Sequence, residues 1–108
     1  MRGPIALVGG NEWKPPAAPL DSWLLERSGA NIVTIVPTAS RQHPEMAVET
    51  AAKYFSEMGA DVDGLMVLNR EDADDESQAK TVSNSKFIYI AGGDPGFLAQ
   101  SLRDTKVW

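Results

Sequence analysis

Four short apolar segments recur along the chain, with polar segments of helical character between them. Each is nearly continuous in its apolar residues and rich in isoleucine, valine and leucine. They are PIALV (4–8), NIVTIV (31–36), DGLMVL (63–68) and KFIYIA (86–91). Strands that are buried on both faces have this pattern, which is typical of a parallel sheet covered by helices. The spacing leaves room for a crossover helix after each strand, so the pattern predicts four strand–helix units.

The segments that follow the strands predict four helices. In the first, Leu20, Trp23 and Leu24 share one apolar helical face. In the second, Pro44 fits the first helical position, and in the fourth Asp94 is the expected N-cap. The first two helices end in a glycine, which favours the left-handed conformation found there. The predicted helices are LDSWLLERSG (20–29), HPEMAVETAAKYFSEMG (43–59), the weaker DDESQAKTVSNS (74–85) and DPGFLAQSLRD (94–104).

This series predicts one α/β domain over residues 1–108, with an open parallel sheet of four βα units and right-handed crossovers. The strand order expected for such a sheet is 2-1-3-4. In that order, segment 86–91 lies beside segment 63–68 and has one unpaired edge. Ligands of open α/β sheets bind at the carboxyl ends of the strands, so the site is expected in the loops that follow the strands.

The loops after the strands supply the candidate cleft. Two of them contain a glycine pair, which indicates either a sharp turn or the close approach of another group to the backbone. For Gly92 and Gly93 two interpretations stay open together. One is a tight turn capped by Asp94, and the other is a glycine N–H that serves as an oxyanion donor. The candidate cleft-lining residues are Gly9, Gly10, Asn11, Pro37, Thr38, Ser40, Gly92, Gly93 and Asp94.

Composition excludes several classes of function. The net charge of −5 and the pI of about 4.7 argue against a nucleic-acid partner, since phosphate binding needs a concentrated basic surface. The chain has no cysteine, which excludes disulfides and thiolate metal sites. No apolar run reaches the ~20 residues that span a bilayer, and the N-terminus is typical of a first strand rather than a signal peptide. We therefore expect a cytoplasmic protein without a membrane partner.

Other candidate chemistry has simpler explanations. GGNEW (9–13) lacks the spacing of a dinucleotide-binding loop and no P-loop occurs, so no cofactor is expected. Ser40 and His43 could form a nucleophile–base pair, but capping of the helix that begins at Pro44 by either residue is the favoured alternative. The acidic segment 71–76 is better explained as a solvated loop and a favourably charged helix start than as a metal site.

The order of motifs resembles the cyanophycinase and aspartyl dipeptidase (peptidase E) family of serine peptidases, which has a class I glutamine-amidotransferase-like α/β fold. The similarity runs from Gly9 to Trp108. Its motifs are a glycine pair with asparagine after the first strand, PTAS (37–40), YFSEMGADVDGLMVLNREDA (54–73), FIYIAGGD (87–94) and SLRDTKVW (101–108).

The resemblance implies that the loop after the fourth strand supplies backbone donors beside the active site, at Gly92 and Gly93, and that PTAS lines the same cleft. It also implies that the nucleophilic serine follows a fifth strand, in an elbow resembling GTSAGA, and that the catalytic histidine lies further on. Neither is found in these 108 residues. The family often has glutamine after GGD, where this chain has Pro95, so a side-chain substrate contact at that position is in doubt.

The resemblance therefore indicates the N-terminal part of a hydrolase acting on peptide bonds next to acidic residues, without catalytic residues of its own and inactive alone. A stand-alone ligand-binding or assembly module of the same fold is the alternative. A glutamine-amidotransferase-like subunit would need a nucleophilic cysteine, which is missing. Because KFIYIA is apolar and nearly uncharged, we also expect homo-oligomers to form through its unpaired edge.

Overall fold

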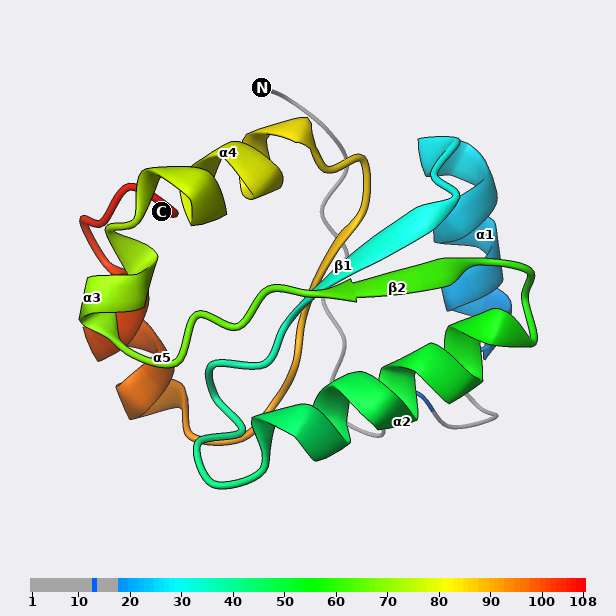
Figure 1. Cartoon of the computed structure of the whole chain (residues 1–108). Helices are drawn as coiled ribbons and strands as arrows, with labels where there is room; N and C mark the ends of the chain where they lie inside the picture. Colours follow the sequence, from blue (N-terminus) through cyan, green and yellow to red (C-terminus); the bar gives the residue numbers. More distant parts are fainter. Residues whose placement is uncertain (1–12, 14–17) are drawn as a thin grey trace.

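The computed structural model describes Trp13 and residues 18–108 (Figure 1). Three strands confirm the second, third and fourth apolar segments. The first segment, 4–8, and the candidate residues Gly9, Gly10 and Asn11 lie outside the described residues. In chain order the elements are α1 (Ala18–Ser28), β1 (Ile32–Val36), α2 (Pro44–Ser56), β2 (Asp61–Gly64), α3 (Arg70–Ala73), α4 (Glu76–Asn84), β3 (Ile88–Ile90) and α5 (Pro95–Leu102).

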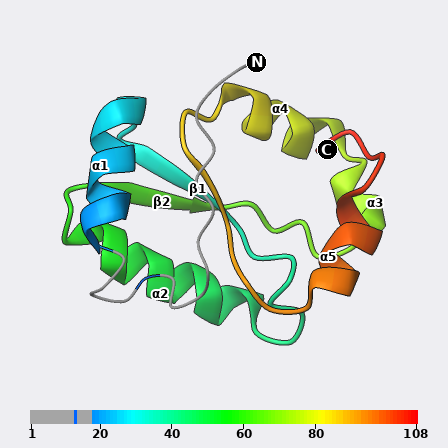
Figure 2. The ribbon, with the colours of Figure 1, turned by 180° about the vertical axis from the view of Figure 1, so that it is seen from behind.

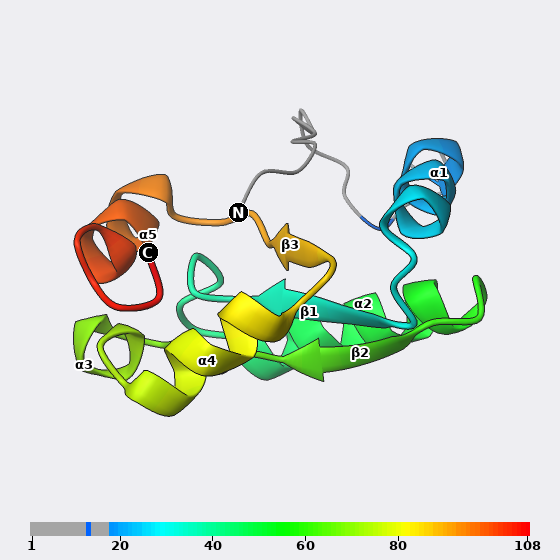
Figure 3. The same cartoon turned by 90° about the horizontal axis from the view of Figure 1, so that it is seen from above.

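The strands form one parallel sheet with the order β2-β1-β3, which confirms the predicted α/β class. Figure 3 shows β1 between the other two, with all three strands pointing toward α3 and α5. Val33 pairs with Val62 on one side of β1, and Ile35 pairs with Tyr89 on the other.

The predicted strand order was wrong. β3 lies beside β1, not beside β2, and both β2 and β3 use β1 as their partner. The burial of the strands gives the physical reason. Val33 and Ile35 of β1 are fully buried, as suits a strand paired on both sides, whereas Asp61 and Asp63 of β2 are exposed. Charged residues of this kind are typical of an edge strand.

β2 also begins and ends earlier than segment 63–68. Leu65 still donates its backbone N–H to the carbonyl of Ile35, at 2.8 Å, and the chain then leaves the sheet while Leu65 and Val67 stay buried. Gly64 ends the strand under α2. A Cβ atom built on it would lie 2.9 Å from Cγ2 of Val48, so the absence of a side chain at Gly64 lets the helix approach the sheet closely.

Helices cover both faces of the sheet, with α2 on one side and α4 on the other (Figure 1). One core cluster joins β1 and β3 to α2, and a second lies toward the carboxyl ends of the strands, between the sheet and α3 to α5. The first consists of Val33, Ile35, Ala51, Phe55, Ala60, Phe87 and Tyr89, and the second of Val36, Leu65, Val67, Ala73 and Leu102.

The apolar face predicted for the first helix is only half covered. Leu24 packs partly buried against the first core cluster, but Leu20 is 41% exposed and Trp23 is 52% exposed, with the guanidinium of Arg27 lying over the Trp23 ring. The single buried residue of α1 is Asp21, which the apolar pattern did not reveal. Figure 2 shows α1 beside the C-terminal half of α2.

The helix ends confirm most of the predicted signals. Gly29 and Gly59 follow α1 and α2 with positive φ, and Pro44 is the first residue of α2. The four-residue helix α3 was not predicted; it begins after Asn69, whose side chain accepts a hydrogen bond from the N–H of Asp72. In the part of the chain that the structure describes, no helix has the length and apolar character needed to cross a membrane.

Candidate functional site

The loops after β1 and β3 meet at the carboxyl ends of these neighbouring strands. Ala91 donates its N–H to the carbonyl of Val36 at 3.0 Å, which extends the pairing just beyond the strands. Asp94 then donates its N–H to the carbonyl of Ala39 at 2.8 Å, and the hydroxyl of Ser40 donates to the carbonyl of Gly92 at 3.1 Å. The predicted candidates Ser40, Gly92, Gly93 and Asp94 therefore lie together at one rim.

Gly93 is required by the way these loops approach each other. A Cβ atom built on it would lie 2.1 Å from the carbonyl oxygen of Ala39, well inside any possible contact, and its φ of +149° is strained for other residues. Gly92 and Gly93 are both exposed. Within the described residues, no hydrogen bond uses the N–H of either glycine, whereas the N–H of Asp94 is held by Ala39.

Asp94 confirms its predicted role as the N-cap of α5, because its Oδ1 accepts a hydrogen bond from the N–H of Phe97 at 3.0 Å. Its Oδ2 lies 3.4 Å from the guanidinium of Arg41, and that guanidinium sits 4.3 Å from the centre of the Phe97 ring. The backbone hydrogen bond from Phe97, with a smaller contribution from Arg41, holds the pKa of Asp94 below its usual value. Neither Arg41 nor Phe97 was among the predicted candidate residues.

Pro37 and Thr38 lie beneath the rim rather than on it. Both are buried, and the Thr38 hydroxyl donates to the carbonyl of Val67 at 2.5 Å. This bond ties the loop after β1 to the segment that follows β2. The two residues thus fix the position of Ser40 without being exposed to a ligand.

Ser40 and His43 neither cap α2 through their side chains nor pair with each other. The Ser40 hydroxyl is used by Gly92, and the contact between the two residues is the bond from the His43 backbone N–H to the Ser40 carbonyl, at 2.8 Å. His43 occupies the N-cap position of α2, but its side chain makes no capping hydrogen bond. His43 therefore confirms the predicted cap by its position, but it supplies no side-chain hydrogen bond, in keeping with the preference of side-chain capping for short hydroxyl or carboxamide groups.

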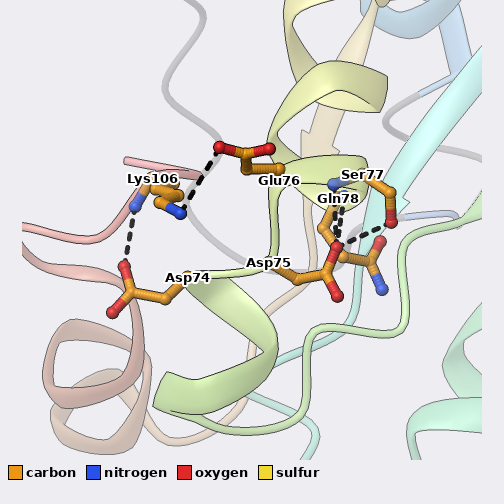
Figure 4. A network of polar contacts seen from close by, with 6 residues as sticks. All are labelled: Asp74, Asp75, Glu76, Ser77, Gln78 and Lys106. Carbon is orange, nitrogen blue, oxygen red and sulfur yellow. Dashed lines mark hydrogen bonds and ion pairs between the residues drawn. The ribbon is translucent and has the colours of Figure 1, made fainter.

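The acidic segment 71–76 stabilises helix starts and the C-terminal residues (Figure 4). Asp75 caps α4 by accepting hydrogen bonds from the N–H groups of Ser77 and Gln78, and the bonds from Ser77 hold the pKa of Asp75 below its usual value. Asp74 accepts a bond from the backbone N–H of Lys106 at 3.1 Å, while the Lys106 ammonium lies 3.7 Å from Glu76.

The described carboxylates do not converge. Asp72 points to the backbone N–H of Leu68, at 3.0 Å, away from Asp74 and Asp75. Over Trp13 and residues 18–108, no three histidine or carboxylate side chains are grouped so that they would hold a metal ion.

One hollow of the described part of the chain is separate from the rim. It has a volume of about 450 Å³ and lies at the opposite, amino ends of the strands, where Asn31, Ile32 and Lys86 contribute to its lining. The rim itself is an open surface built from two loops and the first turn of α5.

The chain is similar in sequence to known proteins over nearly its whole length. Among curated proteins, the chain is 31% identical over 97% of its length to a cyanophycinase of Geminocystis herdmanii, and 28% identical over 96% of its length to a cyanophycinase of Thermosynechococcus vestitus. It covers 39% and 33% of those proteins, so the chain spans little more than a third of the length of the curated relatives it matches.

The chain also resembles a solved structure, that of a peptidase. The fold matches the crystal structure of a peptidase from an acI-B1 Actinobacterium with a TM-score of 0.82 and 33% sequence identity, over 94% of this chain and 45% of the other. The family model of peptidase family S51 matches residues 5–108, nearly the whole chain. The resemblance found in the sequence motifs is thereby confirmed, and the chain belongs to peptidase family S51.

Proposed function

We propose that these residues form one wall of the hydrolytic cleft of a serine peptidase, with the Gly92–Gly93 turn as the oxyanion-binding element. The observation that carries this proposal is the fit of Gly93 against the carbonyl of Ala39. This fit holds the exposed glycine turn at the carboxyl end of β3, where no described hydrogen bond uses the N–H of either glycine. The relatives support the reaction class, since they carry the names cyanophycinase and peptidase.

The electrostatics of the rim suit a developing negative charge. α5 begins at Pro95, directly after the turn, so its positive N-terminal end faces the same space. Asp94 is the one carboxylate in the turn, and its charge is directed to the N–H of Phe97 and to Arg41. Exposed backbone N–H groups in such a field stabilise the oxyanion that forms when a peptide carbonyl is attacked.

We further propose that the 108 residues by themselves do not turn over peptides, and that the nucleophile and base come from another part of an S51 peptidase. His43 is the single histidine in the sequence. Its side chain does not cap the helix, and the Ser40 hydroxyl already donates to Gly92. Without an activated hydroxyl, the oxyanion donors have no tetrahedral intermediate to stabilise.

A fluorophosphonate probe and a panel of aspartate-containing dipeptides test this proposal. The 108-residue chain should remain unlabelled and should release no product. In a polypeptide that joins these residues to a family nucleophile, Gly93→Ala keeps the backbone N–H but displaces the turn from Ala39, so it should lower kcat/KM by about a hundredfold, as the loss of an oxyanion donor does. Stoichiometric labelling of the 108-residue chain at Ser40 would contradict it, and an unchanged kcat/KM would exclude the turn as the oxyanion site.

We also propose that copies of this chain associate through the outer edge of β3. Among the described residues β3 pairs with β1 alone, and Ile88 and Ile90 on its open face are 39% and 51% exposed. Sedimentation at tens of micromolar should show dimers or larger species, and Ile90→Lys should convert them to monomers. Met46→Lys, at an apolar residue that is 61% exposed on α2, is the matched control and should leave association unchanged. A monomeric wild-type chain would refute this contact.

A further inference from the structure

Helix α1 is held to the rest of the domain in an unusual way. Its one buried residue is Asp21, which is 0% exposed, while Leu24 and Leu25 are only partly buried against the core. Helices of globular proteins are normally docked by a buried apolar stripe, and ionisable residues are rarely buried completely without an ionic partner. The docking of α1 therefore depends to a large extent on the state of one carboxyl group.

Among Trp13 and residues 18–108, Asp21 meets a tyrosine and no cation. The hydroxyl of Tyr54, on α2, donates to Oδ2 of Asp21 at 2.6 Å, while Oδ1 is buried without a hydrogen-bond partner among the described residues. Tyr89 of β3 is the other ionisable group of this cluster, since it acts on Tyr54 electrostatically and stacks obliquely on Trp13 at 5.5 Å. Neither tyrosine brings a positive charge to the carboxyl group.

Charged residues on α1 itself do not neutralise Asp21. Glu26 and Arg27 are exposed, and the guanidinium of Arg27 lies over Trp23, 5.4 Å from the ring centre. A buried carboxylate without a cation is costly, so the neutral acid is the form that such surroundings favour. Burial raises the pKa of Asp21, and the hydrogen bond from Tyr54 opposes this only in part. The pKa of Tyr54 is raised as well, so its hydroxyl remains a donor.

The contact between α1 and α2 is also loosely packed on one side. A hollow of about 310 Å³ lies between the C-terminal ends of the two helices, where Leu25, Glu26 and Met58 contribute to its lining. α1 thus has space to move at one end while Asp21 and Tyr54 hold the other.

We propose that the buried carboxyl group of Asp21, positioned by the hydrogen bond from Tyr54, is a proton-sensitive latch. Its burial keeps α1 docked on α2 when Asp21 is protonated and releases the helix when Asp21 ionises. This device does not depend on the proposed peptidase function, because neither residue lies at the rim. It would make the exposure of α1, and of the start of β1 that follows it, respond to pH.

The direction of the pH effect follows from linkage. The folded pKa lies above the unfolded value of about 3.9, so the docked helix binds the proton more tightly than the released one. The latch is fully closed below the unfolded pKa and is lost as the pH rises through the folded pKa. Between these two values the equilibrium constant for opening should increase up to about tenfold for each pH unit, and above them it should level off.

Two measurements on the 108-residue chain test the latch. A ¹³C NMR titration should show the Asp21 carboxyl titrating above about 3.9, the value of an unstructured aspartate. Amide hydrogen exchange, corrected for intrinsic rates, should show residues 18–28 opening more often as the pH rises. Asp21→Asn cannot ionise and should abolish this rise, whereas Glu26→Gln removes an exposed charge from the same helix and should preserve it.

A third variant separates the latch from a purely structural role. Tyr54→Phe removes the donor that favours the ionised form, so the Asp21 carboxyl should titrate at a still higher pH than in the wild type. This measurement remains informative if Asp21→Asn fails to fold. An Asp21 titration at or below about 3.9, the value of an unstructured aspartate, would overturn the proposal. So would opening of α1 that does not change with pH in the wild type.

Discussion

The rim and the α1–α2 contact solve the same problem, the placement of polar groups in a small domain, in opposite ways. At the rim, Asp94 and Ser40 both have hydrogen-bond partners and are exposed or half-buried. Under α1, Asp21 is completely buried with one oxygen unpaired, and the indole N–H of Trp13 is likewise buried without a partner in the described part of the chain. The polar side chains of the rim are therefore hydrogen-bonded and its backbone is closely packed at Gly93, whereas the α1 contact contains a buried carboxyl group that is more stable when protonated.

Among the tests of this contrast, Gly93→Ala should have the largest effect on stability. The new methyl group would overlap a backbone carbonyl, which cannot rotate away, so we expect a loss of about 3 kcal/mol in the free energy of unfolding. Urea denaturation followed by circular dichroism measures it. Gly96→Ala is the matched control, because a methyl group there meets only Oδ1 of Asp94, at 3.4 Å, and should stabilise by up to about 1 kcal/mol. Equal effects of the two variants would show that the rim is not rigid.

The second test acts on the α1 contact. Tyr54→Phe leaves Asp21 buried with no donor, and we expect a loss of about 2 kcal/mol at acidic pH, where Asp21 is neutral and α1 is docked, measured in the same way. Thr50→Val serves as the control on the same helix, since it removes an exposed hydroxyl that bonds the carbonyl of Met46 and should change stability by less than about 0.5 kcal/mol. A harmless Tyr54→Phe would mean that α1 is docked by its leucines.

The smallest expected effect is the change with pH in the stability contributed by Asp94 and by Asp21, which should have opposite signs. The pKa of Asp94 is lowered in the folded chain, so its contribution to stability is present above the unfolded pKa and is lost as the pH falls through the folded one. Asp21 should behave in the opposite sense. The difference in urea midpoint between wild type and Asp94→Asn should therefore shrink on acidification, while that between wild type and Asp21→Asn should shift in favour of the wild type. If acidification shifted both midpoint differences in the same direction, the contrast between the rim and the α1 contact would be refuted.

Local sequence patterns predicted which segments form strands and helices better than they predicted which strands pair with each other. Three of the apolar runs, the cap at Asp94 and the glycine ends of the first two helices follow from chemistry within a few residues, and the structure contains them. The strand order, in contrast, depends on tertiary packing, which places β1 between β2 and β3. The aspartates of β2 were a usable signal for an edge strand that the apolar run 63–68 obscured.

The site was predictable in its backbone and less so in its side chains. A glycine pair after a strand already indicated a close approach, but the contact with Ala39 depends on which strand lies beside β3. Arg41 gave no local signal, because its partners Asp94 and Phe97 are more than fifty residues away. Asp21 was missed for a related reason, since the helical periodicity was assigned to leucine and tryptophan residues that the fold leaves partly outside.

The close contact between Gly64 and Val48 has a consequence for how this domain tolerates change. Because the helix rests its valine directly where a side chain on the strand would begin, the two positions share a fixed volume. A methyl group added at Gly64 fits only if side-chain volume is removed at Val48. Gly64→Ala should therefore destabilise the domain alone and be tolerated together with Val48→Ala. We therefore expect this contact to accept changes as compensated pairs, because the distance between helix and sheet depends on the combined volume of the two side chains.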